Sequence, residues 1–156
     1  MGEVSLMNGF DKQKKDMAKK VRLTAYVERG KGKGNFSTYC TETVENCGLH
    51  GYGSTAREAM EDAYVGVQEY KEMWAKEGKE FPDVEFNFVL DIGSFFDYYP
   101  IDVTAFAKYI GMNASALRQY VAGIRYPRKE QVEKFQEGVR KFAGDLVTDL
   151  QVGHLP

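Results

Sequence analysis

The sequence predicts an α+β chain in which a small β-sheet with one covering helix, in the order β-β-β-α-β, precedes a compact all-α domain. Three observations predict it. Three short stretches before Gly93 alternate apolar and polar residues, as strands with one buried face do. One longer stretch, from Thr55 to Gly78, repeats its apolar residues at three- and four-residue steps. After Gly93 the alternation stops and short helical stretches follow.

The first strand is predicted over Val21–Glu28, because its apolar residues fall at every second position. The glycine-rich run RGKGKGN then suits a hairpin turn into a second strand over Asn35–Thr41. Phe36, Thr38 and Cys40 share one face of that strand. A short third strand is expected around Leu49–Tyr52. The polar, Lys-rich residues 1–20 are expected to form a loose arm.

The long amphipathic helix has readable ends. Thr55 and Glu58 match a capping box, in which each side chain bonds a backbone N–H at the start of a helix, and Gly78 marks the stop. Pro82 then breaks the chain, and alternating apolar residues from Val84 to Ile92 predict the last strand.

Three helices are predicted beyond this strand, over Val103–Ile110, Ala114–Ala122 and Arg128–Phe142. Asp102 suits the N-cap of the first, and either Asn113 or Ser115 suits that of the second. The predicted domains are therefore an α/β domain over residues 21–95 and a helical domain over residues 100–148. The linker between them is aromatic, with Phe95, Phe96, Tyr98 and Tyr99, so we expect it to be packed.

Composition excludes several classes of protein. With 156 residues, 43% of them hydrophobic and 28% charged, the chain is long enough for a core and too polar for a membrane protein. Its two cysteines, Cys40 and Cys47, cannot form a disulfide scaffold, and the sequence has no apolar stretch of signal or membrane-spanning length. We therefore expect a cytoplasmic protein without membrane contact.

The net charge of −2 is the sum of unlike parts. Residues 104–129 contain no Asp or Glu and five cationic side chains, so the rest of the chain carries −7. Residues 55–85 carry four cations and nine carboxylates, a balance of −5. A basic run free of acids is the electrostatic pattern of a surface that meets phosphates, and an acidic helix suits a basic partner.

A helix-turn-helix is predicted in the run VTAFAKYIGMNASALRQYVAGIRYP, residues 103–127. Ala107 permits a close helix crossing, Gly111 supplies the turn, and Phe106, Ile110, Leu117 and Tyr120 or Val121 supply a small core. The second helix of such a motif reads bases in the major groove. Residues predicted to contact DNA are Asn113, Ala114, Ser115, Arg118, Gln119, Arg125, Tyr126, Arg128 and Lys129.

Arg can bond guanine in a bidentate manner and Gln can bond adenine, whereas Ser115 and the loop residues suit phosphates. Because one such motif reads a half-site, we expect a homodimer or a higher homo-oligomer on double-stranded operator DNA. The alternative is a small helical bundle used for protein contact, since helix-Gly-helix spacing alone is common.

The chain resembles the HicB antitoxin family, in its members with a C-terminal helix-turn-helix. The resemblance covers Val21 to about Leu146. It rests on the strand-hairpin-strand opening, on Cys47 and the Gly51-Gly53-Thr55 run into TAREAMEDA, and on VTAFAKYIGMNASALRQYVAG. Residues 42–48, ETVENCG, depart from the family's usual Pro-Asp-Leu-Pro-Gly-Cys pattern, which affects the loop contacts expected there.

The resemblance implies a partial RNase H-like domain that binds and neutralises a small basic mRNA-cleaving toxin, HicA, and a helix-turn-helix that represses the operon. The alternative is a stand-alone DNA-binding regulator whose α/β domain dimerises or senses a ligand.

Other chemistries fit the sequence less well. Nuclease activity in an RNase H-like sheet needs clustered carboxylates, and only Glu28 and Asp91 stand near strand ends. Cys40, Cys47, His50 and His154 match no zinc spacing. The run HGYGST before the helix lacks a Walker lysine, so its glycines are interpreted as a tight entry to the helix. We expect no enzyme activity, no metal and no cofactor.

Overall fold

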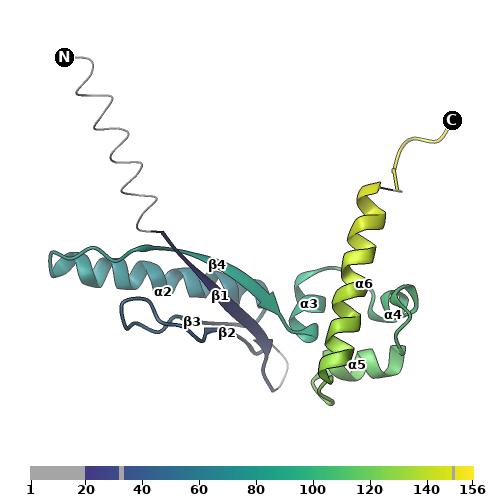
Figure 1. The fold of residues 1–156 in the computed structure, drawn as a ribbon, viewed down its shortest axis with the longest axis horizontal. Helices are drawn as coiled ribbons and strands as arrows, with labels where there is room; N and C mark the ends of the chain where they lie inside the picture. The colour runs from purple at the N-terminus through teal and green to yellow at the C-terminus, as the bar shows by residue number, and fades with distance from the viewer. Residues whose placement is uncertain (1–19, 32–33, 149) are drawn as a thin grey trace. The chain divides into compact units, whose positions relative to one another are not determined.

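The computed structural model describes residues 20–31, 34–148 and 150–156. The predicted arm, apart from Lys20, lies outside these residues. The described chain is α+β, with a four-stranded mixed sheet and five helices. It divides into two compact units, Met1–Asp91 and Ile92–Pro156, which we describe separately (Figure 1).

The sheet contains β1 (Lys20–Arg29), β2 (Phe36–Cys40), β3 (His50–Gly53) and β4 (Asp83–Leu90), in the order β3-β2-β1-β4. β1 pairs antiparallel with β2, and β2 with β3, whereas β1 and β4 are parallel. A parallel pair needs a crossover connection, and the helix α2 (Ala56–Lys76) lies in it. The predicted strands and their order along the chain are confirmed, with ends that differ by one or two residues.

Helix α2 covers one face of the sheet, where small residues allow a close approach (Figure 1). Ala56, Ala59 and Ala63 are fully buried along the inner side of the helix. A Cβ on Gly51 of β3 would lie 2.2 Å from the Ala59 carbonyl oxygen. The glycine is therefore required by helix-sheet packing. The buried core of this unit contains Leu23, Ala25, Val44, Leu49, Ala63, Val67, Phe81, Val84 and Phe86.

The start of α2 forms the predicted capping box and extends it by one residue. The Thr55 hydroxyl accepts from the Glu58 N–H at 3.1 Å, and the Glu58 carboxylate accepts in return from the Thr55 backbone. The Glu58 carboxylate also accepts from the backbone N–H of Ser54, 2.8 Å away, and from the Ser54 hydroxyl at 2.5 Å. These bonds lower the pKa of Glu58 below its ordinary value. The bonding of Glu58 therefore also includes Ser54, the residue before the cap.

The helical unit begins earlier than predicted. Residues expected as the end of a strand and a linker form α3 (Ile92–Tyr98), and Ile92 is buried in the helical core. Phe95 and Phe96 pack on the same core, which confirms that this aromatic segment is packed. The prediction that it forms a linker was wrong, because it forms helix α3.

Three further helices match the predicted ones: α4 (Val103–Ile110), α5 (Ala114–Ala122) and α6 (Lys129–Thr148). The last begins one residue later than predicted and runs six residues past Phe142, where Leu146 is exposed. Their core contains Ile92, Phe106, Ala107, Met112, Leu117, Tyr120 and Phe135. Among residues 20–31, 34–148 and 150–156, no helix has the length and apolar character that crossing a membrane requires.

Candidate nucleic-acid interface

Helices α4 and α5 form a tight pair joined by Gly111, Met112 and Asn113. Gly111 has φ +71°, a left-handed conformation that favours glycine, and the Met112 N–H bonds the Ala107 carbonyl at 2.9 Å to close the end of α4. Asp102 caps α4 by accepting from the Ala105 N–H at 2.7 Å, as predicted.

Asn113 is the N-cap of α5, which settles the choice left open between Asn113 and Ser115. Its side-chain oxygen accepts from the Ala116 N–H at 2.9 Å. An asparagine there satisfies a backbone donor that the helix itself leaves unpaired. The Asn113 side chain therefore orients α5, and Ser115 lies inside the helix with its side chain exposed.

The predicted packing between these helices is confirmed at most positions. Ala107 and Leu117 are completely buried, which is consistent with a close crossing of the two axes. Phe106 and Tyr120 complete the buried set, whereas Ile110 and Val121 are half-buried at its margin. Of the two residues predicted as alternatives, Tyr120 is the more buried.

One side of α5 is left open to solvent. Ser115, Arg118 and Ala122 are exposed at three- and four-residue steps, so they lie along one stripe of the helix. Gln119 is half-buried beside this stripe, and Ala114 is half-buried at the first position of the helix. We call Ser115, Arg118, Gln119 and Ala122 the α5 stripe; it contains three polar side chains and no carboxylate.

A contact that the sequence did not predict fixes the guanidinium of Arg118. Its Nη1 donates to the hydroxyl of Thr104, in the first turn of α4, at 2.9 Å. A guanidinium has five N–H donors, so this bond uses one and leaves the other Nη and Nε able to donate in parallel. The contact depends on the crossing of two helices, and sequence spacing alone carries no signal for it.

The loop that follows α5 is attached to the end of that helix. The Gln119 carbonyl accepts from the backbone N–H groups of Ile124 at 3.1 Å and Arg125 at 3.4 Å. The Arg125 guanidinium carbon lies 5.9 Å from the centroid of the Tyr120 ring, within cation–π range. Tyr126 is 79% exposed and Arg128 is exposed beside it. The loop therefore presents cations and an aromatic ring to solvent.

Ile124, in the same loop, is 78% exposed. Its exposure beside Arg125 could not be predicted from the sequence, because isoleucine is more often buried than exposed. Lys129 begins α6 and lies 3.9 Å from Glu133, one turn further on. Such exposed pairs on a helix are weak, so Lys129 keeps most of its attraction for a phosphate.

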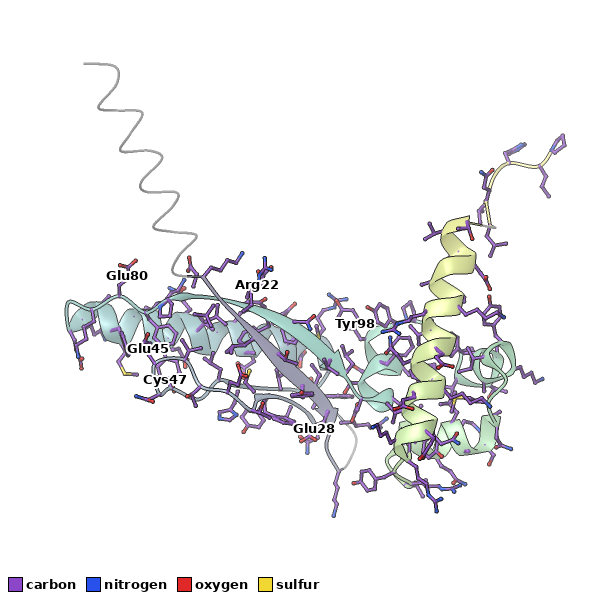
Figure 2. All side chains as sticks on the ribbon, in the orientation of Figure 1. Arg22, Glu28, Glu45, Cys47, Glu80 and Tyr98 are labelled. Atoms are coloured by element: carbon purple, nitrogen blue, oxygen red, sulfur yellow. The ribbon has the colours of Figure 1, made fainter. Side chains whose placement is uncertain are left out.

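Glu28 and Asp91, the carboxylates weighed for nuclease chemistry, lie at the same end of the β1–β4 pair, but each accepts from a different group. Glu28 lies near one end of β1 and Arg22 near the other (Figure 2). The Glu28 carboxylate accepts from the Ser37 hydroxyl at 3.3 Å, whereas the Asp91 carboxylate accepts from the Arg29 N–H at 3.0 Å. Within the described ranges, no three His, Cys, Asp or Glu side chains gather as metal ligands would. Burial, assisted by Glu42, raises the pKa of the Cys40 thiol, which opposes the thiolate form that binds metal.

No protein-family model, curated protein or solved structure matches this chain.

Proposed function

We propose that the chain is a DNA-binding transcriptional repressor of the HicB antitoxin type, in which α4 and α5 act as a helix-turn-helix. The observation that carries the proposal is the α5 stripe, an open polar helix face inside a region of the sequence without acids. A recognition helix needs an open polar face toward the major groove and cations toward the phosphates.

Each residue has a role that its surroundings support. Arg118, with one N–H held by Thr104, presents its other donors in the parallel arrangement that matches O6 and N7 of guanine. Gln119 suits adenine and Ser115 either a base or a phosphate, while the methyl group of Ala114 suits thymine. Asn113 positions the helix.

The phosphate contacts are assigned to the loop and to the start of α6. Arg125, Tyr126, Arg128 and Lys129 are all exposed and can donate to phosphate oxygens. Neutralising phosphates releases counterions, so affinity should fall steeply as salt rises. Two copies are needed for a full operator, with half-sites about one helical turn apart.

The test is a titration of a fluorescent duplex with the full chain, with Arg118→Ala compared with Arg140→Ala. Both variants remove an exposed arginine from the same unit, but Arg140 lies on α6, outside the proposed interface. We expect Arg118→Ala to weaken binding by about 1 to 3 kcal/mol and to relax one base preference, with little change for Arg140→Ala. If both variants lost the same amount of binding affinity, binding would depend only on nonspecific electrostatic attraction, which would contradict the assignment of Arg118 to base recognition.

For the sheet unit we propose a partial RNase H-like domain that binds a small basic toxin of the HicA type. The outer side of α2 supports this, because Glu61, Glu69 and Glu72 are exposed there. Anionic side chains on one helix face attract a cationic partner and raise its association rate.

The toxin proposal is tested on the product of a short basic reading frame next to this gene, co-expressed with the full chain. Reversing two charges together, Glu61→Lys and Glu69→Lys, should reduce co-purification at least tenfold, whereas Glu137→Lys on α6 should not. A neighbouring product that fails to bind the unaltered chain favours the alternative, a stand-alone regulator whose sheet unit dimerises or senses a ligand.

A further inference from the structure

The sheet face opposite α2 carries a row of aromatic and apolar side chains. The strand registers align Val89, Tyr26, Tyr39 and His50 across all four strands. The rings of Tyr26 and Tyr39 stack with centroids 5.5 Å apart, yet they remain 36% and 37% exposed. Tyr52, one row further along, is 68% exposed and Val89 is 43% exposed. We call these five residues the open face.

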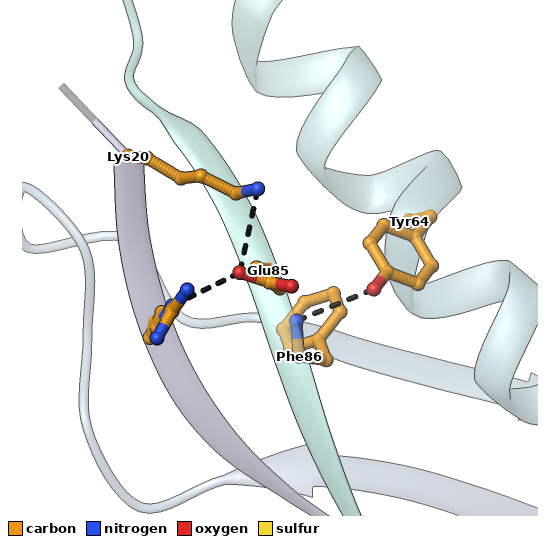
Figure 3. Close-up of polar contacts among 5 residues, drawn as sticks. Lys20, Tyr64, Glu85 and Phe86 are labelled. Carbon is orange, nitrogen blue, oxygen red and sulfur yellow. Dashed lines mark hydrogen bonds and ion pairs between the residues drawn. The ribbon is translucent and has the colours of Figure 1, made fainter. Parts of the chain in front are cut away.

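Helix α2 accepts a hydrogen bond from one backbone N–H at each edge of this sheet. The Tyr52 N–H on β3 donates to the Asp62 carboxylate at 2.8 Å. At the other edge, the Phe86 N–H on β4 donates to the Tyr64 hydroxyl at 3.3 Å (Figure 3). A strand from another chain would have to compete with these bonds. These two bonds disfavour pairing at the edges, so we assign partner binding on the sheet to the open face.

The charges around the open face balance one another. Glu85 lies 3.4 Å from the Lys20 ammonium and 3.0 Å from the Arg22 guanidinium (Figure 3). The strands carry two further carboxylates on this side, Glu28 and Asp83; Asp83 is in register with Lys20 and forms an ion pair with Lys71 of α2. With Lys71 included, three cations meet three carboxylates, which leaves no excess of positive charge to attract a nucleic-acid backbone. A neutral, largely aromatic patch is instead complementary to a copy of itself.

We propose that two copies of the chain pair through the open face, with the Val89–Tyr26–Tyr39–His50 row of one packed on the same row of the other about a two-fold axis. The biological role of this pairing rests on the proposed function, because a full operator requires two copies of α5. The contacts that would form the pair, however, all lie in the sheet unit.

The size of the surface fits a reversible dimer. Strands of 10, 5, 4 and 8 residues, spaced about 4.8 Å apart with a rise of about 3.3 Å per residue, form a face of about 400 Å² in projection. Side-chain relief increases the accessible area, so pairing removes on the order of 1,000 Å² from water, near the lower limit for a specific interface. Interfaces at this lower limit are typically weak and reversible, so we expect the dimer to dissociate in the micromolar range, with a dissociation constant on the order of 10 µM.

The test is sedimentation velocity of the full chain from about 1 to about 200 µM, a range that brackets this constant. Val89→Glu is compared with Val65→Glu, because both valines are about half exposed and Val65 lies on α2, outside the open face. Each pair formed by Val89→Glu would bury two new carboxylates, so its dissociation constant should rise at least tenfold. Val65→Glu should dimerise like the unaltered chain, and Tyr52→Glu should weaken pairing even if Val89→Glu fails to fold.

Several outcomes would overturn the pairing: a monomer at every concentration, a dimer that Val89→Glu and Tyr52→Glu leave intact, or equal weakening by Val65→Glu. Binding of oligo-dT or oligo-U that Tyr52→Glu abolishes, without self-association, would assign the face to single-stranded nucleic acid instead. A chain that dimerises through this face but binds no duplex DNA would refute the proposed repressor function and leave the proposed pairing intact. A chain that binds duplex DNA but never dimerises would refute the pairing and leave DNA binding intact.

Discussion

Two glycines of α6 should respond in opposite directions to the same substitution. Gly138 is buried where α6 meets α4, whereas Gly144 lies further along the same helix, and a methyl group added to it would have no other group within 4 Å. Alanine at either position gains helix propensity, because glycine has the greater conformational freedom to lose. Only Gly138 has a neighbour that the new methyl group would strike.

The magnitude follows from the distances at Gly138. A Cβ there would lie 2.5 Å from Cγ2 and 2.6 Å from Cβ of Ile110, about 1 Å inside ordinary carbon contact. Because both distances are well under 3 Å, relieving this clash in a packed core costs about 2 to 3 kcal/mol, the upper part of the usual range, and the propensity gain returns about 1 kcal/mol. We expect Gly138→Ala to lower the free energy of unfolding by about 1 to 2 kcal/mol and Gly144→Ala to raise it by up to about 1 kcal/mol.

The assay is urea unfolding followed by far-UV circular dichroism, with the fluorescence of Trp74 as an internal control. Trp74 is the chain's one tryptophan and packs against the core of the sheet unit. At about 2 kcal/mol per molar urea, the Gly138→Ala midpoint of the helical unit should fall by about 0.5 to 1 M while that of Gly144→Ala rises. Equal shifts, or a stabilised Gly138→Ala, would refute the close packing of α4 on α6.

Three further predictions concern helix packing, a helix cap and acid dependence. Gly51→Ala should prevent stable folding of the sheet unit, measured by loss of cooperative Trp fluorescence unfolding, because its methyl group would meet the Ala59 carbonyl at 2.2 Å; a normal transition would contradict this. Asn113→Ala should cost about 1 kcal/mol of unfolding free energy and weaken duplex binding, and Asn113→Ser should restore both. The lowered pKa of Glu58, caused first by Ser54, contributes stability that is present above the unfolded pKa near 4.5 and is lost as pH falls through the folded value. The difference in unfolding free energy between Glu58→Gln and the unaltered chain should therefore shrink as the pH falls below 4.5 and through the folded pKa of Glu58, and a difference that stays constant with pH would contradict the linkage.

Periodicity predicted most of the elements because each has one buried face. The alternation in β1 and the three- and four-residue steps in α2 report burial directly, so the sequence sufficed for these. It failed at Ile92, which continues the parity of β4 although the chain has already turned into α3. Alternation cannot distinguish one more strand residue from the first buried residue of a short helix.

The site was predictable to the extent that it is local. Cap residues and the glycine turn can be identified from a few neighbours, so Asp102 and Gly111 were predicted from sequence alone. The choice between Asn113 and Ser115 required backbone geometry, and the contact of Thr104 with Arg118 required the packing of two helices. Tertiary contacts of this kind have no fixed sequence spacing.

The most direct test of the central claim, that α5 reads base edges in duplex DNA, is selection of binding sites from a random duplex library by the full chain. The account predicts an enriched motif of two inverted half-sites about one helical turn apart, in which Arg118→Ala loses preference at one guanine in each half. Enrichment of no motif, or of the same motif with the same preferences by Arg118→Ala, would contradict it.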